Sequence, residues 1–152
     1  MRPPALALGS WLLLSTAGSG CASQAECSQA SCESEAVVTF PADLFDGGLS
    51  GPFDLVIEGD GTTAIARCND PSAPETADNP EGLACNGQGF TLDGHPLANE
   101  REVVVTIIRL ETDEVVSESV RLDAIEEITP NGPDCPPLCV VRNGQLRTGV
   151  GS

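Results

Sequence analysis

Hydrophobic and polar residues alternate along much of this chain, which is the pattern of β-strands that bury one face. The alternation is clearest at 53–58 (FDLVIE) and at 114–122 (EVVSESVRL). The segment 102–110 (EVVVTIIRL) is apolar on nearly both faces, so we expect it to be a central strand. Seven strands are predicted in all, at 36–40, 53–58, 62–68, 90–93, 102–110, 114–122 and 138–142.

Turn signals separate these segments and limit how they connect. Gly59-Asp60-Gly61 predicts a hairpin into 62–68, with Ile65 pointing inward. The segment 123–128 (DAIEEI) fits a helical turn as an alternative. The whole pattern predicts an all-β fold, a small antiparallel β-sandwich of immunoglobulin-like or transthyretin-like type stapled by disulfides. Its core would include four phenylalanines: Phe40, Phe45, Phe53 and Phe90.

The N-terminus has the layout of a secretion signal. Met1-Arg2 supplies a positive charge, 5–14 (ALALGSWLLL) supplies an apolar stretch, and 15–20 (STAGSG) supplies small residues. An apolar stretch of this length is too short to cross a bilayer, which takes roughly 20 residues. The signal therefore predicts that the remainder of the chain is exported.

Cys21 directly follows this segment and is the candidate lipidation site. Ser19-Gly20 before it resembles the processing box of bacterial lipoproteins, from which Gly18 departs because an aliphatic residue is usual there. The resemblance implies that Cys21 carries acyl chains such as palmitate and becomes the mature N-terminus. Ala22 in the next position implies the outer membrane. The alternative is ordinary signal cleavage, for example after Ala17 or Ala22, which would give a secreted or periplasmic product.

These patterns divide the chain into four parts. Residues 1–20 are the expected lipoprotein signal peptide, and 21–34 a lipid-anchored polar spacer, either a tether or a disulfide-bound cap. Residues 35–142 are the expected sandwich domain. Residues 143–152, which are polar and rich in glycine, are the expected flexible tail.

The charge of the exported part excludes some partners. It holds all 23 acidic residues against six arginines, because Arg2 leaves with the signal and the chain has no lysine. Such a surface repels nucleic-acid phosphates and anionic headgroups, so no nucleic acid is expected as a partner. The expected membrane contact is made through the lipid anchor instead.

Six cysteines remain after Cys21, an even number that predicts three disulfides in an exported domain. Cys68 and Cys85 bracket a polar loop and are the favoured pair. The other four either pair locally or join the two chain ends. Their C-x4-C and C-x3-C spacings are also compatible with a zinc site, which oxidation of the thiols would prevent. The six disulfide candidates are Cys27, Cys32, Cys68, Cys85, Cys135 and Cys139.

The sequence offers no catalytic constellation and implies no cofactor. The single histidine, His95, lies in a turn rich in Gly and Pro without a nucleophile motif beside it. Asp43 and Asp46 are oxygen ligands in a flexible segment and are candidates for calcium. The segment lacks the EF-hand pattern, so a plain turn is the favoured interpretation. We therefore expect a protein that is not an enzyme.

The segment 130–139 (PNGPDCPPLC) resembles a family of small cysteine-containing lipoproteins of the myxobacterial type, which has no assigned activity. The stretch 62–68 followed by Cys85 is similar to theirs as well. The resemblance implies a location in the cell envelope and a sandwich fold, and it brings no catalytic residues. The expected function is a structural or partner-binding role there. The alternative is a secreted module that binds a peptide, a carbohydrate or calcium.

Overall fold

The structure is a computed structural model and describes residues 30–71 and 79–147. It contains nine β-strands and one short 3-10 helix within those ranges, two strands more than the sequence predicted. The elements are β1 (Glu35–Thr39), β2 (Phe53–Gly59), β3 (Thr62–Cys68), β4 (Leu83–Asn86), β5 (Gly89–Asp93), η1 (Pro96–Asn99), β6 (Glu102–Arg109), β7 (Val115–Arg121), β8 (Asp123–Ile128) and β9 (Cys139–Gln145).

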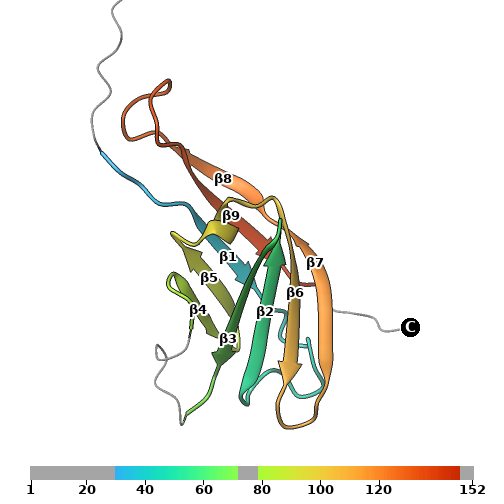
Figure 1. Cartoon of the computed structure of the whole chain (residues 1–152). Coiled ribbons are helices and arrows are strands. Elements are labelled where there is room, and N and C mark those ends of the chain that lie inside the picture. The colour runs from blue at the N-terminus through green and yellow to red at the C-terminus, as the bar shows by residue number, and fades with distance from the viewer. Residues whose placement is uncertain (1–29, 72–78, 148–152) are drawn as a thin grey trace, which may run out of the picture.

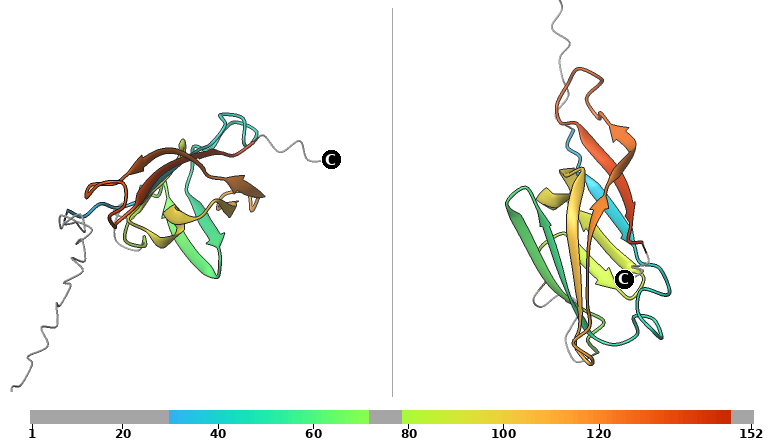
Figure 2. Two further views of the ribbon diagram at one scale, coloured as in Figure 1. Left: turned by 90° about the horizontal axis from the view of Figure 1, so that it is seen from above. Right: turned by 90° about the vertical axis from the view of Figure 1, so that its right-hand side faces the viewer.

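The strands form two sheets packed face to face, which confirms the predicted small β-sandwich (Figure 1). One sheet has five strands in the order β4-β5-β1-β9-β8, and the other has four in the order β3-β2-β6-β7. All pairs are antiparallel except β1 with β9, which run parallel. Two further views show the layers and the β8–β9 hairpin, which extends past the rest of the sandwich (Figure 2).

The core lies between the two sheets and is aliphatic with a small aromatic cluster. The ring of Phe40 contacts those of Phe53 and Phe90, with centroids 6.3 and 6.0 Å apart. All four phenylalanines are at most 8% exposed, as predicted. Burial of such side chains is the main favourable contribution to folding, at about 25 cal/mol per Å² of apolar surface.

The turn between β2 and β3 has the geometry that the sequence predicted. Gly59 pairs with Thr62, so Asp60 and Gly61 form a two-residue loop. Both have positive φ, 32° and 80°, as the tightest hairpin turns require.

The prediction that Ile65 points inward is wrong, because Ile65 is 58% exposed. The inward positions of β3 are Ala64, Ala66 and Cys68, and side chains alternate along a strand. The Cys68–Cys85 bond draws Cys68 toward the opposite sheet, and this fixes which face of β3 lies inside. Ile65 therefore lies on the outer face, opposite Val56 of β2.

The strand β6 occupies the central position expected for it, between β2 and β7. Only one of its faces is buried, however. Val103, Val105 and Ile107 are at most 1% exposed, whereas Val104 is 39% exposed. The apolar residues on its second face therefore contribute to the surface and not to the core.

Two strands correct the sequence analysis. The segment 123–128 is the strand β8 and not a helical turn, because it pairs with β9 through a bulge at Ile125. The strand β4 was missed because it has only four residues. Its signal was the dipeptide Asn86-Gly87, which starts the hairpin to β5.

The sandwich also begins and ends differently from the predicted boundaries. The strand β9 continues to Gln145, and Leu146 is fully buried, with its N–H donating to Thr39 O at 3.1 Å. The expected tail 143–152 thus begins inside the sheet, and 148–152 lie outside the described residues. At the other end, Ser34 is buried and its Oγ accepts a hydrogen bond from Val140 N. The described end of the spacer, 30–34, is therefore a bound cap and not a tether.

Two disulfides hold distant parts of the chain together. Cys68–Cys85, the favoured pair, joins β3 of one sheet to β4 of the other. Cys32–Cys139 joins the segment before β1 to the start of β9. Cys135 is disulfide-bonded as well, so these cysteines lack the thiolates that a zinc site needs. Cys21 and Cys27 lie outside the described residues.

The disulfides indicate an oxidising, extracytoplasmic environment. Within 30–71 and 79–147, no helix is long and apolar enough to cross a membrane.

In a background that carries Cys135→Ala, so that the bond of Cys135 does not hold the same loop closed, replacing Cys32 and Cys139 together by alanine should lower the free energy of unfolding more than the same change at Cys68 and Cys85. The bonds close loops of 107 and 17 residues. In the chain-entropy model, closures near these lengths are worth about 4.7 and about 3 kcal/mol. Urea unfolding followed by circular dichroism measures both losses. A larger loss for the shorter loop would show that native contacts of the Cys68–Cys85 bond outweigh loop closure.

Candidate interaction surfaces

The exposed large hydrophobic side chains gather in two places on the sandwich. Ile65, Val104 and Val115 lie on the outer face of the four-stranded sheet, and Leu110 follows the end of β6. Ile125 and Leu138 lie on the β8–β9 hairpin, where they are 61% and 56% exposed. Clustered exposed apolar residues mark contact surfaces more often than scattered ones do.

We call the outer face of the four-stranded sheet the aliphatic face. Its centre is set by strand register, because Val56 pairs with Ile65 on one side and with Thr106 on the other. In the adjacent row Ile108 pairs with Val115. The neighbouring side chains are close enough to form one continuous surface of branched residues. Its aliphatic members are Val56, Ile65, Val104, Ile108 and Val115.

Short polar side chains complete the aliphatic face between its branched residues. The hydroxyls of Thr106 and Ser117 share a hydrogen bond of 2.8 Å, in which one donates and the other keeps its own O–H for a further partner. Ser119 Oγ donates to Glu102 Oε1 at 2.6 Å on the border of the face. Hydroxyls that are already hydrogen-bonded in this way cost less free energy to bury in an interface than unpaired ones do.

The border of the aliphatic face carries the charge. Arg67 pairs with Asp54 at 2.8 Å, and this pair is exposed enough to contribute little stability. Glu58 and Glu102 on the same outer face have no arginine partner in the described ranges. The face is therefore apolar at its centre and charged at its border, where Asp54, Glu58 and Glu102 stand with Arg67 and Arg121.

Arg109 holds the loop between β1 and β2 against the end of the sandwich. Its Nη2 donates to Gly48 O at 3.3 Å, and its guanidinium lies 5.5 Å from the centroid of the Phe45 ring. The Thr112 hydroxyl and the Arg109 guanidinium both donate to Glu114, and they lower the pKa of its exposed carboxyl below the usual value. These contacts make the loop part of the folded domain.

The calcium candidates Asp43 and Asp46 lie in this loop, and both are exposed. Leu44 N donates to Pro41 O and Gly48 N to Phe45 O, which are the hydrogen bonds of ordinary turns. Nowhere in 30–71 and 79–147 do three or more His, Cys, Asp or Glu residues gather in a way that could hold a metal ion.

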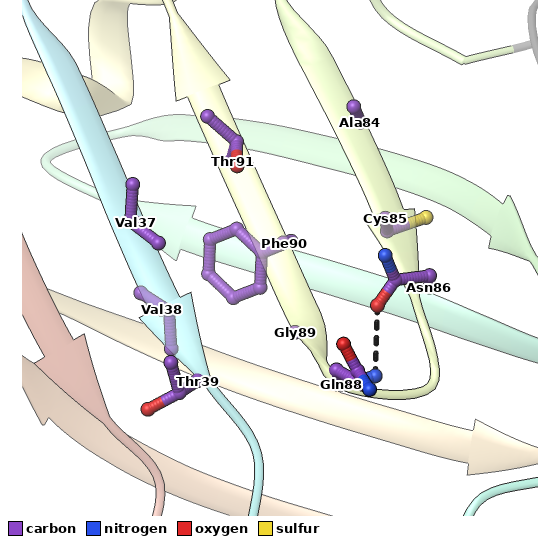
Figure 3. A pocket seen from close by; sticks show the side chains of 10 residues that line it. All are labelled: Val37, Val38, Thr39, Ala84, Cys85, Asn86, Gln88, Gly89, Phe90 and Thr91. Carbon is purple, nitrogen blue, oxygen red and sulfur yellow. Dashed lines mark hydrogen bonds between the residues drawn. The ribbon is translucent and has the colours of Figure 1, made fainter.

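The outer face of the five-stranded sheet is different in character, because it carries two adjoining hollows. One, of about 380 Å³, lies over β1, β4 and β5 (Figure 3). The other, of about 670 Å³, lies between β1, β9 and the end of β7. Val37 and Thr39 line both. The remaining amide and charged lining is divided equally between four amides and four charged residues, and the charged ones lie on β7, at the start of β8 and after the end of β9: Asn86, Gln88, Asn143, Gln145, Glu118, Arg121, Asp123 and Arg147.

Two of the glycines that line these hollows are required by the packing of the sheet. Gly144 of β9 lies close to β7, since a Cβ there would be 2.8 Å from Val120 Cγ1 and 3.0 Å from Arg121 O. Gly89 has φ 153°, and a Cβ there would collide with Val38 O. A side chain at either position would disturb the sheet, so glycine is required for packing.

His95 has a structural role that the sequence did not reveal. It is 9% exposed, and its Nδ1 accepts the N–H of Leu97 at 3.2 Å, which caps the short helix η1. The neutral ring therefore carries its proton on Nε2. Burial lowers the pKa of His95 below 6.5, because the charged form would lose its hydration.

The β8–β9 hairpin is bound to the segment that precedes β1. Ala30 N donates to Asn131 Oδ1, and Asn131 Nδ2 donates to Ala30 O, both at 3.0 Å. The Cys32–Cys139 disulfide reinforces this contact two residues further along. The chain thus enters the described domain at the hairpin end (Figure 1).

Sequence reasoning did not identify the aliphatic face. Its signal was present in the residues of β2 and β6 that alternate with the buried ones, because Val56, Val104 and Ile108 are apolar where a solvated face would be polar. In a sequence, apolar residues on both sides of a strand also indicate burial of both faces. Only the arrangement of the sheets separates the two interpretations.

Comparisons with protein-family models, with curated proteins and with solved structures find no significant match to this chain.

Lowering the pH from 7.5 to 5.5 should reduce the stability of the protein through His95. Its pKa is lower in the folded state than in the unfolded state, where it is about 6.5. The unfolded chain therefore binds more protons than the folded chain in this pH window. The folding stability that is present above pH 6.5 is lost as the pH falls. His95→Asn keeps a capping acceptor without this titration and should flatten the profile. Urea unfolding at several pH values measures how the free energy of unfolding depends on pH. Equal slopes for the natural protein and for His95→Asn would contradict the role given to His95.

Proposed function

We propose that this protein is a cell-envelope lipoprotein, anchored in the outer membrane by acyl chains on Cys21, whose β-sandwich is a non-catalytic module that binds a partner protein. The signal-like sequence before Cys21 and the disulfides support the location. The aliphatic face supports the binding role, and it is the single observation on which that role rests.

The aliphatic face suits a protein partner because branched aliphatic residues of four neighbouring strands form it, and its two central hydroxyls are hydrogen-bonded to each other. Ile65 and Val115 are both 58% exposed, although the sandwich already has a complete core without them. Covering one such side chain contributes about 1.5–3 kcal/mol. A group of exposed branched aliphatic residues that lie side by side is characteristic of a contact surface.

The charge of the chain defines the partner further. The net charge is −16, and the border of the aliphatic face contributes Glu58 and Glu102. Contact surfaces with complementary charge associate faster and more selectively. The partner proposed here therefore offers an apolar surface bordered by basic side chains.

A second candidate function is binding of a neutral polar ligand, a peptide or a carbohydrate, in the hollows of the five-stranded sheet. Amide and hydroxyl side chains line them, and these donate and accept hydrogen bonds to such ligands. The chain after residue 20 has no Trp or Tyr, so the stacking that most sugar sites use is missing. This weighs against the carbohydrate version.

The intact mass of the protein recovered from a Gram-negative envelope tests the lipoprotein assignment. We expect a chain that begins at Cys21 with added acyl mass and gains six hydrogens on reduction, one for each remaining cysteine. Cys21→Ala is the matched control and should abolish the acyl mass while leaving the disulfides. An unmodified mass for the natural sequence would refute the anchor.

A photo-crosslinking residue placed at Val104 tests the binding role in the envelope. We expect a discrete adduct that falls about tenfold when Ile65→Glu and Val115→Glu are introduced together, because two apolar contacts are replaced by charges. Unfolding curves should change little, since both side chains are exposed. Ile125→Glu, at a site 61% exposed but outside the face, is the control. Equal loss of the adduct in that control would contradict a role for the aliphatic face.

A further inference from the structure

The β8–β9 hairpin carries the second group of exposed apolar residues, and the proposed function leaves it unexplained. Its tip is the loop 129–138, which follows β8 and leads into β9. Leu138 is 56% exposed at the end of that loop, and Ile125 is 61% exposed on β8. The tip projects beyond the turn that joins β2 to β3 (Figure 2).

The position of the hairpin relative to Cys21 is set by the fixed end of the spacer. Ala30 is held on Asn131 by two hydrogen bonds, and Cys32 is bonded to Cys139. Only nine residue steps separate Cys21 from Ala30. A chain of nine residues spans at most about 30 Å and has an average reach of about 16 Å when flexible.

The composition of the tip suits the boundary between headgroups and acyl chains. Four of its ten residues are prolines, which have no N–H to leave without a partner in an apolar medium. Asp134 is its only charged residue. Leu138 adds an aliphatic side chain, and Ile125 lies behind it on β8.

We propose that the tip of the β8–β9 hairpin rests on the bilayer that holds the lipid anchor, with Leu138 inserted at the acyl boundary. This inference rests on the proposed lipidation of Cys21. A short tether keeps the tip at a local concentration in the millimolar range, so a weak contact suffices. In this orientation the aliphatic face lies roughly parallel to the membrane normal, so the bilayer does not cover it and a partner can reach it.

The acidic residues near the tip determine which bilayer it prefers. Asp134 in the loop and Glu126 and Glu127 on β8 are exposed. They repel an anionic surface, so the contact is expected on zwitterionic lipids and should weaken as anionic lipid is added.

The experiment uses the absence of tryptophan after residue 20, since Trp11 leaves with the signal. Leu138→Trp makes residue 138 the only tryptophan in the lipidated protein. After reconstitution into phosphatidylcholine–phosphatidylethanolamine vesicles, we expect a blue-shifted emission, quenching by brominated lipids and several-fold weaker quenching by acrylamide. Ile65→Trp is the matched control, because Ile65 is 58% exposed on the aliphatic face. Its emission should not change on reconstitution.

The outcomes separate this inference from the proposed function. The intact mass of each sample is measured first, and an unlipidated chain would refute the anchor itself. A lipidated protein whose tryptophan at 138 stays as accessible to acrylamide as that at 65 would overturn the inference. Equal shifts at both positions would overturn it as well, because the sandwich would then lie flat on the membrane. Ile125→Trp provides a second probe of the hairpin if the first variant fails to fold.

Discussion

The pairing of β1 with both β5 and β9 is the contact on which the rest of this structure depends. The strand β1 lies at the centre of the five-stranded sheet, although it is the first strand within 30–71 and 79–147. Its parallel partner β9 is the last, and Cys32–Cys139 ties the two together across 107 residues. Without this pairing the sheet would divide into two hairpins, and the core over the four-stranded sheet would be open to water.

Local patterns in the sequence predicted the parts of the fold that local forces determine. Alternation located the strands that carry buried aliphatic residues, and Asp60-Gly61 located a tight turn, because both signals lie within a few residues. The orientation of Ile65 was predicted wrongly because both neighbours of that residue are alanines, so the alternation gave no preference. Which face of β3 is buried depends on the bond between Cys68 and Cys85, a contact between sheets.

The candidate surfaces were harder to predict, for the same reason. A strand with apolar residues on both faces either has both faces buried or has one of them exposed to solvent. Val104 is an example of the second case. The capping role of His95 could not be predicted, because its partner is the backbone N–H of Leu97 and many other side chains could accept that hydrogen bond. Cys21 remains a prediction from the signal-like sequence, since it lies outside the described residues.

The distance in sequence between β1 and β9 has a consequence for how the protein is made. Contacts between remote segments are slow to form, because a long loop must close before they contribute stability. The five-stranded sheet stays incomplete until the last strand has been synthesised and can reach the first. The sandwich therefore cannot complete its core before β9 has been synthesised, and a chain that has not yet folded is the form that a narrow protein-conducting channel accepts.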